Sequence, residues 1–338
     1  MGIVRLYKVL QCPILIDNNM EELAMVKYLF KRLAQSVFTL FVIISIVFML
    51  LRLMPEEGYL GSTADKMSEI QKETILTNLG LRDPMPVQIG NFYKDLAKGD
   101  FGKSITYRPD VKVSKILKDK IPYSLYFGLG SIGISLVVGI SLGIIMAKSK
   151  NSILDKLGNG YIVFINAVPA AIYYLVIQLY VTGICKLPML FDKSNSVSWI
   201  LPLISMSLGN IASYAMWMRR YMVDELNSDY VKLARAKGVS EKNIMVHHVL
   251  RNAFVPMAQY LPASILYTIA GSIYIESLYS IPGMGGLLVE AIQRQDNPLV
   301  QGLVVIYSSL GILGLVLGDI AMSITDPRIK LQRNGGGR

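Results

Sequence analysis

The stretch YSLYFGLGSIGISLVVGISLGIIMA, residues 123–147, decides the fold class of this 338-residue chain. It contains no charged residue and is followed directly by Lys148. A helix needs about 20 mostly apolar residues to cross a bilayer, and a charge at its centre costs about 3 kcal/mol, so this run predicts a membrane-spanning helix. Composition agrees, with 52% apolar residues, 17% charged residues and a mean hydropathy of +0.44. We therefore expect an all-α membrane protein.

Five further apolar runs of similar length, uncharged except for Asp319 in the last, bring the expected number of membrane-spanning helices to six. They are Leu33–Leu51, about Gly160–Cys185, Trp199–Trp217, Pro256–Ile275 and Leu299–Ile324. Pro169 falls near the start of the third, where a lost backbone hydrogen bond is most easily tolerated. Glycines in the second and sixth runs remove side chains where helices can approach closely. These are Gly128, Gly133, Gly139, Gly143, Gly311, Gly314 and Gly318.

Positive residues in short loops set the orientation of such a protein. With the N-terminus in the cytoplasm, most of them fall on the cytoplasmic side, whereas the outer loops around Asp192 and Asp296 carry few. The cytoplasmic set is Lys148, Lys150, Lys156, residues 219–251, Arg328, Lys330 and Arg333. The net charge of +10 is therefore attributed to membrane orientation, and no nucleic-acid partner is expected.

The polar segment 55–122 separates the first two runs. Its lysines are nearly balanced by acidic residues, and long loops translocate largely regardless of charge, so we expect a small folded extracytoplasmic insert. Within it, Asp65–Leu79 is predicted to be a helix that ends at Gly80.

A second polar segment, SDYVKLARAKGVSEKNIMVHHVLRNAFVP at 228–256, lies between the fourth and fifth runs. It predicts two short helices. Ser228 is expected to cap the first, Asp229–Lys237, and Gly238 to end it. Ser240 is expected to cap the second, Glu241–Asn252, before Pro256 opens the fifth span.

The first of these helices places Tyr230, Leu233, Ala234 and Lys237 on adjoining positions. Apolar and small side chains on one face favour a closely approaching partner surface. The alternative is a solvated basic loop, explained by membrane orientation alone. That alternative does not account for the capped two-helix pattern.

The sequence ARAKG at 234–238, followed by Arg-Asn-Ala at 251–253 and by Pro256, resembles the cytoplasmic loop of ABC importer permeases. More narrowly, it is similar to the oligopeptide and dipeptide permeases of the peptide/nickel branch. Further matches run through the chain from Met25. They are YLFKRL at 28–33, LGLRDPMPVQ at 79–88, GDFGKS at 99–104, ESLYSIPGMGGLL at 276–288 and DPRIKL at 326–331. Lys232, Leu233 and Ala234 stand where the generic motif has Glu-Ala-Ala, a departure that the peptide branch commonly shares.

The resemblance implies a membrane-spanning subunit of an ATP-driven importer in a bacterial plasma membrane, with both termini cytoplasmic. Its expected partners are a second permease subunit in a heterodimer, two ATP-binding cassette subunits, an extracytoplasmic solute-binding protein and a peptide cargo. The chain has no Gly-x-x-x-x-Gly-Lys-Ser/Thr segment, so the energy must come from other subunits, and no enzyme activity is expected. The expected divisions are an extension 1–24, the first span 25–54, the insert 55–122, the permease core 123–324 with its coupling loop 224–255, and a tail 325–338.

The resemblance also implies an ATPase-coupling site in the loop. Gly238 is expected to turn the chain sharply, and Ala234 and Ala236 to let the helix seat deeply. The charges of Arg235, Lys237 and Arg251 are expected to face the rim of the partner or lipid phosphates. The full set is Tyr230, Leu233, Ala234, Arg235, Ala236, Lys237, Gly238, Arg251 and Asn252.

A second candidate site lies at the outer end of the fifth run, where Glu276 precedes Pro282, Gly283 and Gly285. One interpretation makes it a gate or a contact for the binding protein. The other makes it an interfacial carboxylate followed by a flexible turn. Several tyrosines either line a pathway or belong to interfacial belts and core packing. They are Tyr161, Tyr173, Tyr174, Tyr180, Tyr214 and Tyr221.

No cofactor or metal site is expected. Cys12 and Cys185 form no Cys-x-x-Cys pair, and His247 and His248 point about 100° apart on a helix. Other functions stay open from the residues alone: a nickel or oligosaccharide ABC permease, an autonomous channel or secondary transporter, and a membrane-bound sensor or scaffold. A secondary transporter would favour paired charges or broken helices in corresponding halves, and the sequence predicts neither.

Overall fold

The computed structural model describes residues 31–53, 55–61 and 64–325, and every regular element in these ranges is a helix. They include five helices long and apolar enough to cross a bilayer, and a sixth span if one bent pair is counted. The expected all-α membrane fold is therefore confirmed. The extension 1–24 and the tail after Thr325 lie outside the described residues.

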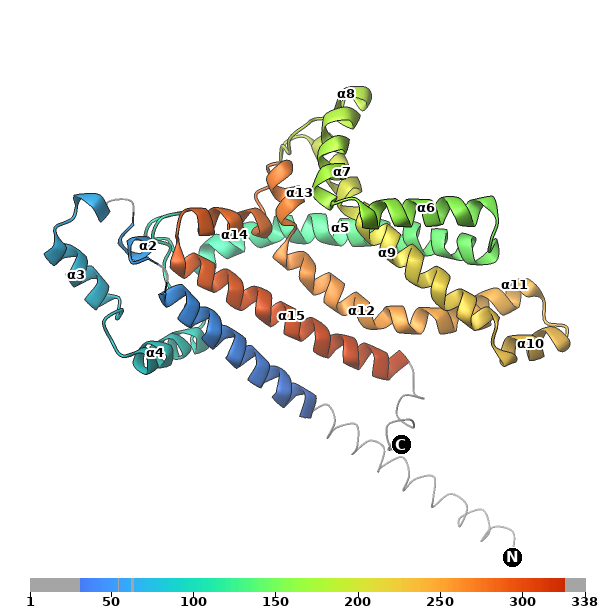
Figure 1. The fold of residues 1–338 in the computed structure, drawn as a ribbon, viewed down its shortest axis with the longest axis horizontal. Helices are drawn as coiled ribbons and strands as arrows, with labels where there is room; N and C mark the ends of the chain where they lie inside the picture. Colours follow the sequence, from blue (N-terminus) through green and yellow to red (C-terminus); the bar gives the residue numbers. More distant parts are fainter. Residues whose placement is uncertain (1–30, 54, 62–63, 326–338) are drawn as a thin grey trace, which may run out of the picture.

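The spans form an elongated bundle (Figure 1). In chain order they are Lys31–Arg52; α5, Val113–Lys148; α6, Ile153–Ala167, with α7, Ala170–Val176, the π-helix η2, Ile177–Val181, and α8, Thr182–Cys185; α9, Ile200–Leu226, preceded by η3, Ser196–Trp199; α12, Arg251–Ala270; and α15, Asn297–Thr325. Two short helices, α13, Ile273–Leu278, and α14, Met284–Gln293, connect α12 to α15.

The third span is broken, so the expectation of one helix over Gly160–Cys185 is wrong. α6 and the α7–α8 segment meet at an angle of 108°. Val168 has extended backbone angles, φ −89° and ψ 128°, and Pro169 follows it. Proline has no N–H to donate and disfavours the helical conformation of the residue before it, which accounts for the break.

The glycines of α5 and α15 permit close helix contacts, as expected. A methyl group on Gly143 would lie 2.7 Å from the carbonyl oxygen of Ala215 on α9. One on Gly314 would lie 2.8 Å from Cα of Ala263 on α12. Gly133 is an exception, because no atom of the described residues lies within 4 Å of the corresponding position. Small residues thus bring α5 against α9 and α12 against α15.

The insert is folded, and its elements are α2, Glu57–Leu60, the 3-10 helix η1, Ala64–Lys66, α3, Glu69–Asn78, and α4, Met85–Ala97. Gly80 follows α3 with φ +69°, as expected for a helix stop. α3 begins later than predicted, because Ser68 and Gln71 form a reciprocal capping box that starts the helix there. The predicted start at Asp65 is therefore wrong.

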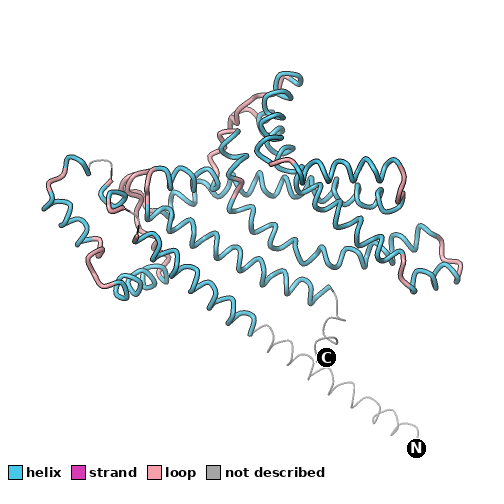
Figure 2. The backbone as a smooth tube through the Cα atoms, in the orientation of Figure 1, coloured by secondary structure: helices cyan, strands magenta, loops and turns pink. Residues whose placement is uncertain are grey.

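The helix α4 packs against the first span. The rings of Phe92 and Phe48 are stacked 5.0 Å apart, and the Tyr93 hydroxyl donates to the Phe41 carbonyl oxygen at 2.9 Å. Figures 1 and 2 place α2, α3 and α4 at one end of the bundle and α10 and α11, described below, at the other. The two polar segments therefore lie on opposite sides of the spanning region.

Candidate functional site

The first loop helix is present as predicted, to within one residue. α10 spans Asp229–Ala236, and Gly238 follows with φ +78°, a left-handed conformation that favours glycine. The expected side-chain cap is not formed, because the Ser228 hydroxyl donates instead to the carbonyl oxygen of Glu225 at 2.6 Å. Ser228 therefore fastens the turn between α9 and α10.

The second loop helix differs from the prediction. α11, Glu241–Asn243, continues through a π-helix, η4, Ile244–Leu250, directly into α12. No helix ends at Asn252, and Pro256 lies inside α12 instead of opening it. This part of the loop is thus an extension of the fifth span.

The helix α10 has two different faces. Val231 is fully buried, and Tyr230 and Ala234 are partly buried in the same apolar cluster, which includes Met222 of α9 and Ile244 of η4. The outward face carries Leu233, which is 56% exposed, together with exposed Ala236 and Lys237. Of the two alanines expected to seat the helix on a partner, Ala234 faces the protein's own core, and only Ala236 is free to do so.

The charges on and near α10 are mostly paired. Arg235 Nε lies 2.7 Å from Oε1 of Glu241, and Lys232 Nζ lies 2.8 Å from Oδ1 of Asp229. The Lys232 ammonium holds the pKa of the Asp229 carboxyl below its usual value. Lys237 makes no ion pair with the part of the chain that the structure describes. The outward face therefore combines an exposed leucine, a small residue and one available cation.

Arg251 and Asn252, the first two residues of the Arg-Asn-Ala sequence, have different environments. Arg251 is exposed at the start of α12. The side-chain amide of Asn252 donates to the Tyr230 hydroxyl at 3.1 Å, and that hydroxyl donates to the Glu225 carboxylate. No pattern in the sequence singles out Glu225, because its partner Tyr230 is five residues away and lies on another helix.

The carboxylate of Glu276 is buried inside the protein, with 2% of the residue exposed. One oxygen accepts from the Ser124 hydroxyl at 2.7 Å, and the other accepts from the N–H groups of Gly285 at 2.6 Å and Gly286 at 3.1 Å. The side chain thus joins α13 to α5 and to the N-terminus of α14, where a helix favours negative charge.

The glycines after Glu276 make room for it. A methyl group on Gly283 would lie 2.4 Å from Cδ of Glu276, and one on Gly285 would lie 2.7 Å from the Ile273 nitrogen. The turn is also buried, with Pro282 partly covered. These glycines serve close packing, which disagrees with the interpretation as a flexible turn. A role as a gate or a binding-protein contact stays a prediction.

A second buried carboxylate is that of Asp296, which the sequence marked only as part of an outer loop with few positive charges. One of its oxygens accepts from the Ser104 hydroxyl at 2.5 Å and from the N–H groups of Ile105, Thr106 and Tyr107 at 2.9–3.1 Å. Its other oxygen accepts from the N–H of Leu299 at 3.2 Å. It therefore anchors the insert to the start of α15. An acidic residue just before Asn-Pro at a helix start is a local signal that could have identified it.

Most of the singled-out tyrosines belong to the core in this chain. Tyr173, Tyr174 and Tyr214 are each less than 10% exposed, and the Tyr161 hydroxyl donates to the Leu208 carbonyl oxygen at 2.8 Å. Tyr180, by contrast, is 66% exposed on η2. These positions favour packing over a pathway lining for the buried tyrosines.

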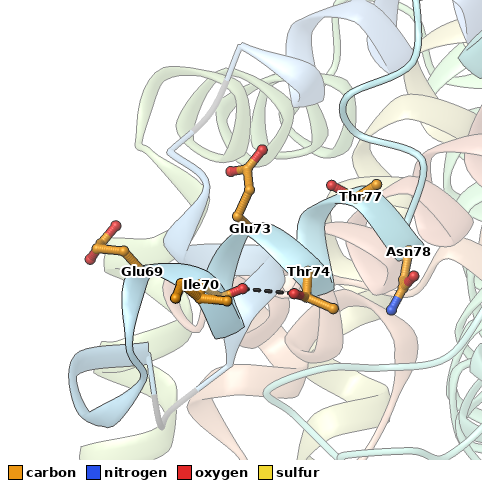
Figure 3. A pocket seen from close by; sticks show the side chains of 6 residues that line it. All are labelled: Glu69, Ile70, Glu73, Thr74, Thr77 and Asn78. Carbon is orange, nitrogen blue, oxygen red and sulfur yellow. Dashed lines mark hydrogen bonds between the residues drawn. The ribbon is translucent and has the colours of Figure 1, made fainter.

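The shallow hollow on the insert shown in Figure 3 comes from one helix only. The Thr74 hydroxyl donates to the Ile70 carbonyl oxygen at 2.7 Å, as within an ordinary helix. The lining residues are Glu69, Ile70, Glu73, Thr74, Thr77 and Asn78, all of α3. Among the described residues no second element lines this hollow, and we assign no site to it.

The amino-acid sequence matches known proteins along nearly the whole chain. A family described as binding-protein-dependent transport system inner membrane component matches residues 139–331, and the N-terminal part of such membrane components matches residues 25–127. The dipeptide transport system permease protein DppB of Bacillus subtilis is 32% identical over 312 residues, which cover 92% of this chain and 100% of that protein. The oligopeptide transport system permease protein OppB of Escherichia coli K12 is 29% identical over 311 residues, 90% of this chain and 100% of that protein. The oligopeptide permease AmiC of Streptococcus pneumoniae is 37% identical over 212 residues, 62% of this chain and 42% of that protein.

Proposed function

Because this chain belongs to the family of binding-protein-dependent transport system inner membrane components, we propose that it forms half of the translocation pathway of a peptide importer. It is an inner-membrane permease subunit of an ABC transporter, a transport component and not a catalytic one. Peptide cargo is supported by the relatives that match over their full length, which are named as dipeptide and oligopeptide permeases. We assign oligopeptides or dipeptides to this chain on that basis.

The proposed complex also contains a second permease subunit, two ATP-binding cassette subunits and a solute-binding protein. The insert 55–122 would lie on the outer side and face the binding protein. The loop 224–255 and both termini would lie on the cytoplasmic side. The location of these segments at opposite ends of the bundle supports this orientation. Energy from ATP would reach the permease through the loop, since the chain contains no phosphate-binding loop.

The proposed contact with the ATPase subunit is the outward face of α10. Leu233 is a large apolar residue that is 56% exposed on a helix whose other face is already packed against the bundle. Ala236 beside it lets a partner approach closely, and Lys237 supplies a charge. We assign these three residues to contact with the ATPase subunit, with Gly238 ending the helix and Arg251 at the edge of the surface.

Copurification tests the docking role. Leu233→Asp combined with Ala236→Trp places a charge and a bulky ring on the outward face without entering the buried face. We expect the ATPase subunits to stop copurifying with this variant. Leu79→Asp, a similar change at a 48% exposed leucine of the insert, is the control and should retain them. Full copurification of the double variant would show that α10 is not the docking helix.

Uptake into proteoliposomes tests the cargo. The assembled complex, given its binding protein and ATP, should accumulate labelled di- and oligopeptides, and excess nickel or maltooligosaccharide should not compete. A binding protein that retains nickel or sugar and ignores peptides would overturn the peptide assignment. Uptake driven by an ion gradient without ATP would instead indicate a secondary transporter.

A further inference from the structure

We propose that Tyr230 is a positioning residue for energy coupling, because its hydroxyl ties the docking helix α10 to two membrane-spanning helices at once. The inference rests on the proposed docking of the ATPase subunit at α10. It concerns the step after docking, in which movement of α10 has to reach the spans. The residues involved are Tyr230 on α10, Glu225 on α9 and Asn252 on α12.

The hydroxyl of Tyr230 uses both of its hydrogen-bonding capacities. It donates to the carboxylate of Glu225 in the last turn of α9, and it accepts from the side-chain amide of Asn252, 3.1 Å away, in the first turn of α12. A phenol is suited to this position because it can donate and accept at the same time. A bond to an ionised carboxylate is also stronger than one between neutral groups.

The hydroxyl keeps its proton in this environment. Burial, and then the neighbouring Glu225 carboxylate, raise the pKa of Tyr230 above its usual value. The imidazole of His248 also lies near the Tyr230 ring, with the two ring centroids 6.5 Å apart. Tyr230 can therefore donate to Glu225 throughout the physiological pH range.

The other contacts of α10 differ in kind. Val231 and Ala234 hold the helix by apolar packing, which depends little on direction. The Arg235–Glu241 ion pair joins α10 to the adjoining helix α11, and it is largely exposed. Among the side-chain hydrogen bonds of the described loop, only those at Tyr230 connect α10 to both α9 and α12. Loss of the hydroxyl should leave α10 in place but free to shift relative to these spans.

Tyr230→Phe in the complete transporter tests this inference, because phenylalanine fills the same volume. We expect the ATPase subunits to copurify as before, and the number of peptides transported per ATP hydrolysed to fall by about fivefold or more, the lower range of typical coupling effects. Tyr260→Phe on α12 is the matched control, since the Tyr260 hydroxyl forms no hydrogen bond with the described residues. It should keep the wild-type ratio.

A second pair of variants separates coupling from folding. Glu225→Gln retains an oxygen that accepts from Tyr230, so this variant should keep most of the wild-type ratio of peptides transported to ATP hydrolysed. Glu225→Ala should lower this ratio as Tyr230→Phe does. A wild-type ratio of transport to ATP hydrolysis in both Tyr230→Phe and Glu225→Ala would overturn the inference. Loss of the ATPase subunits from Tyr230→Phe would also overturn it, because Tyr230 would then be a docking residue. Failure of the wild-type chain to bind ATPase subunits would instead overturn the proposed function, and the inference with it.

Discussion

Arg219 of α9 and Asp155 of α6 form a two-point ion pair, with Nε 2.6 Å from Oδ1 and Nη2 2.8 Å from Oδ2. The Asp155 side chain is 3% exposed and also accepts from the Asn151 N–H and the Asn159 amide. It lies in the first turn of its helix, where negative charge is favoured. The pair ties the start of the broken third span to the helix that leads into α10.

Replacing Arg219 tests the importance of this ion pair. Arg219→Ala leaves a buried carboxylate without its cation, and we expect stability to fall by about 2 kcal/mol, less than for a fully buried pair because Arg219 is 25% exposed. Arg219→Lys should recover only part of this, since lysine cannot make the two-point contact. Thermal unfolding in detergent measures both. Lys98→Ala, which removes an exposed ion pair with Asp95, is the control and should lower the stability by less than about 0.5 kcal/mol. An equal loss of stability in Arg219→Ala and Lys98→Ala would contradict the prediction.

The Glu276 network predicts different results for two substitutions. Glu276→Ala leaves the buried Gly285 N–H without an acceptor, which costs about 1–3 kcal/mol, and the partly buried Gly286 N–H as well, at a smaller cost. Glu276→Gln can turn its oxygen toward these groups and donate to Ser124 from its amide, so it should be much less destabilising. The melting temperature of the purified chain distinguishes the two. Equal melting temperatures for the two variants would show that these hydrogen bonds do not hold α14.

Removing the Asp296 carboxylate should release part of the insert. Asp296→Ala takes the acceptor away from Ser104 and from three successive backbone N–H groups, so residues 104–107 lose their anchor on α15. We expect trypsin to cleave faster after the exposed Lys103 in vesicles that present the insert. Asp192→Ala is the control, because among the described residues that carboxylate accepts hydrogen bonds only from Ser194, within its own turn. Unchanged cleavage in Asp296→Ala would mean that other contacts hold the segment.

Gly238 offers a test of backbone conformation without a steric clash. Its φ is +78°, and within the described part of the chain no atom lies within 4 Å of the position that a Cβ would occupy. Gly238→Ala should therefore destabilise the end of α10 by about 1 kcal/mol through backbone strain alone, and Gly238→Asn by less. Hydrogen exchange of residues 229–237 measures the effect. Faster exchange in Gly238→Asn than in Gly238→Ala would exclude this explanation.

Local signals in the sequence predicted most of the helices. Long apolar runs with no charge, or with Asp319 alone, identified the spans, because the length and low charge needed to cross a bilayer can be counted along the chain. Gly80 and Gly238 marked the ends of α3 and α10, since a left-handed residue at a helix end depends on that residue itself. Pro169 was also visible, but whether a proline is tolerated or breaks a helix depends on what packs around it, and here the bend is 108°.

The sequence by itself determined that the chain crosses a membrane several times and carries a short helix with an apolar and small-residue face between its fourth and fifth spans. Only the tertiary structure decided which face of that helix is free, so that Leu233 is exposed while Ala234 is packed inward. The tertiary structure likewise decided the partners of Glu276 and Asp296. Their hydrogen bonds join residues 152 and 192 positions apart, and contacts over such separations leave no periodic pattern in one sequence.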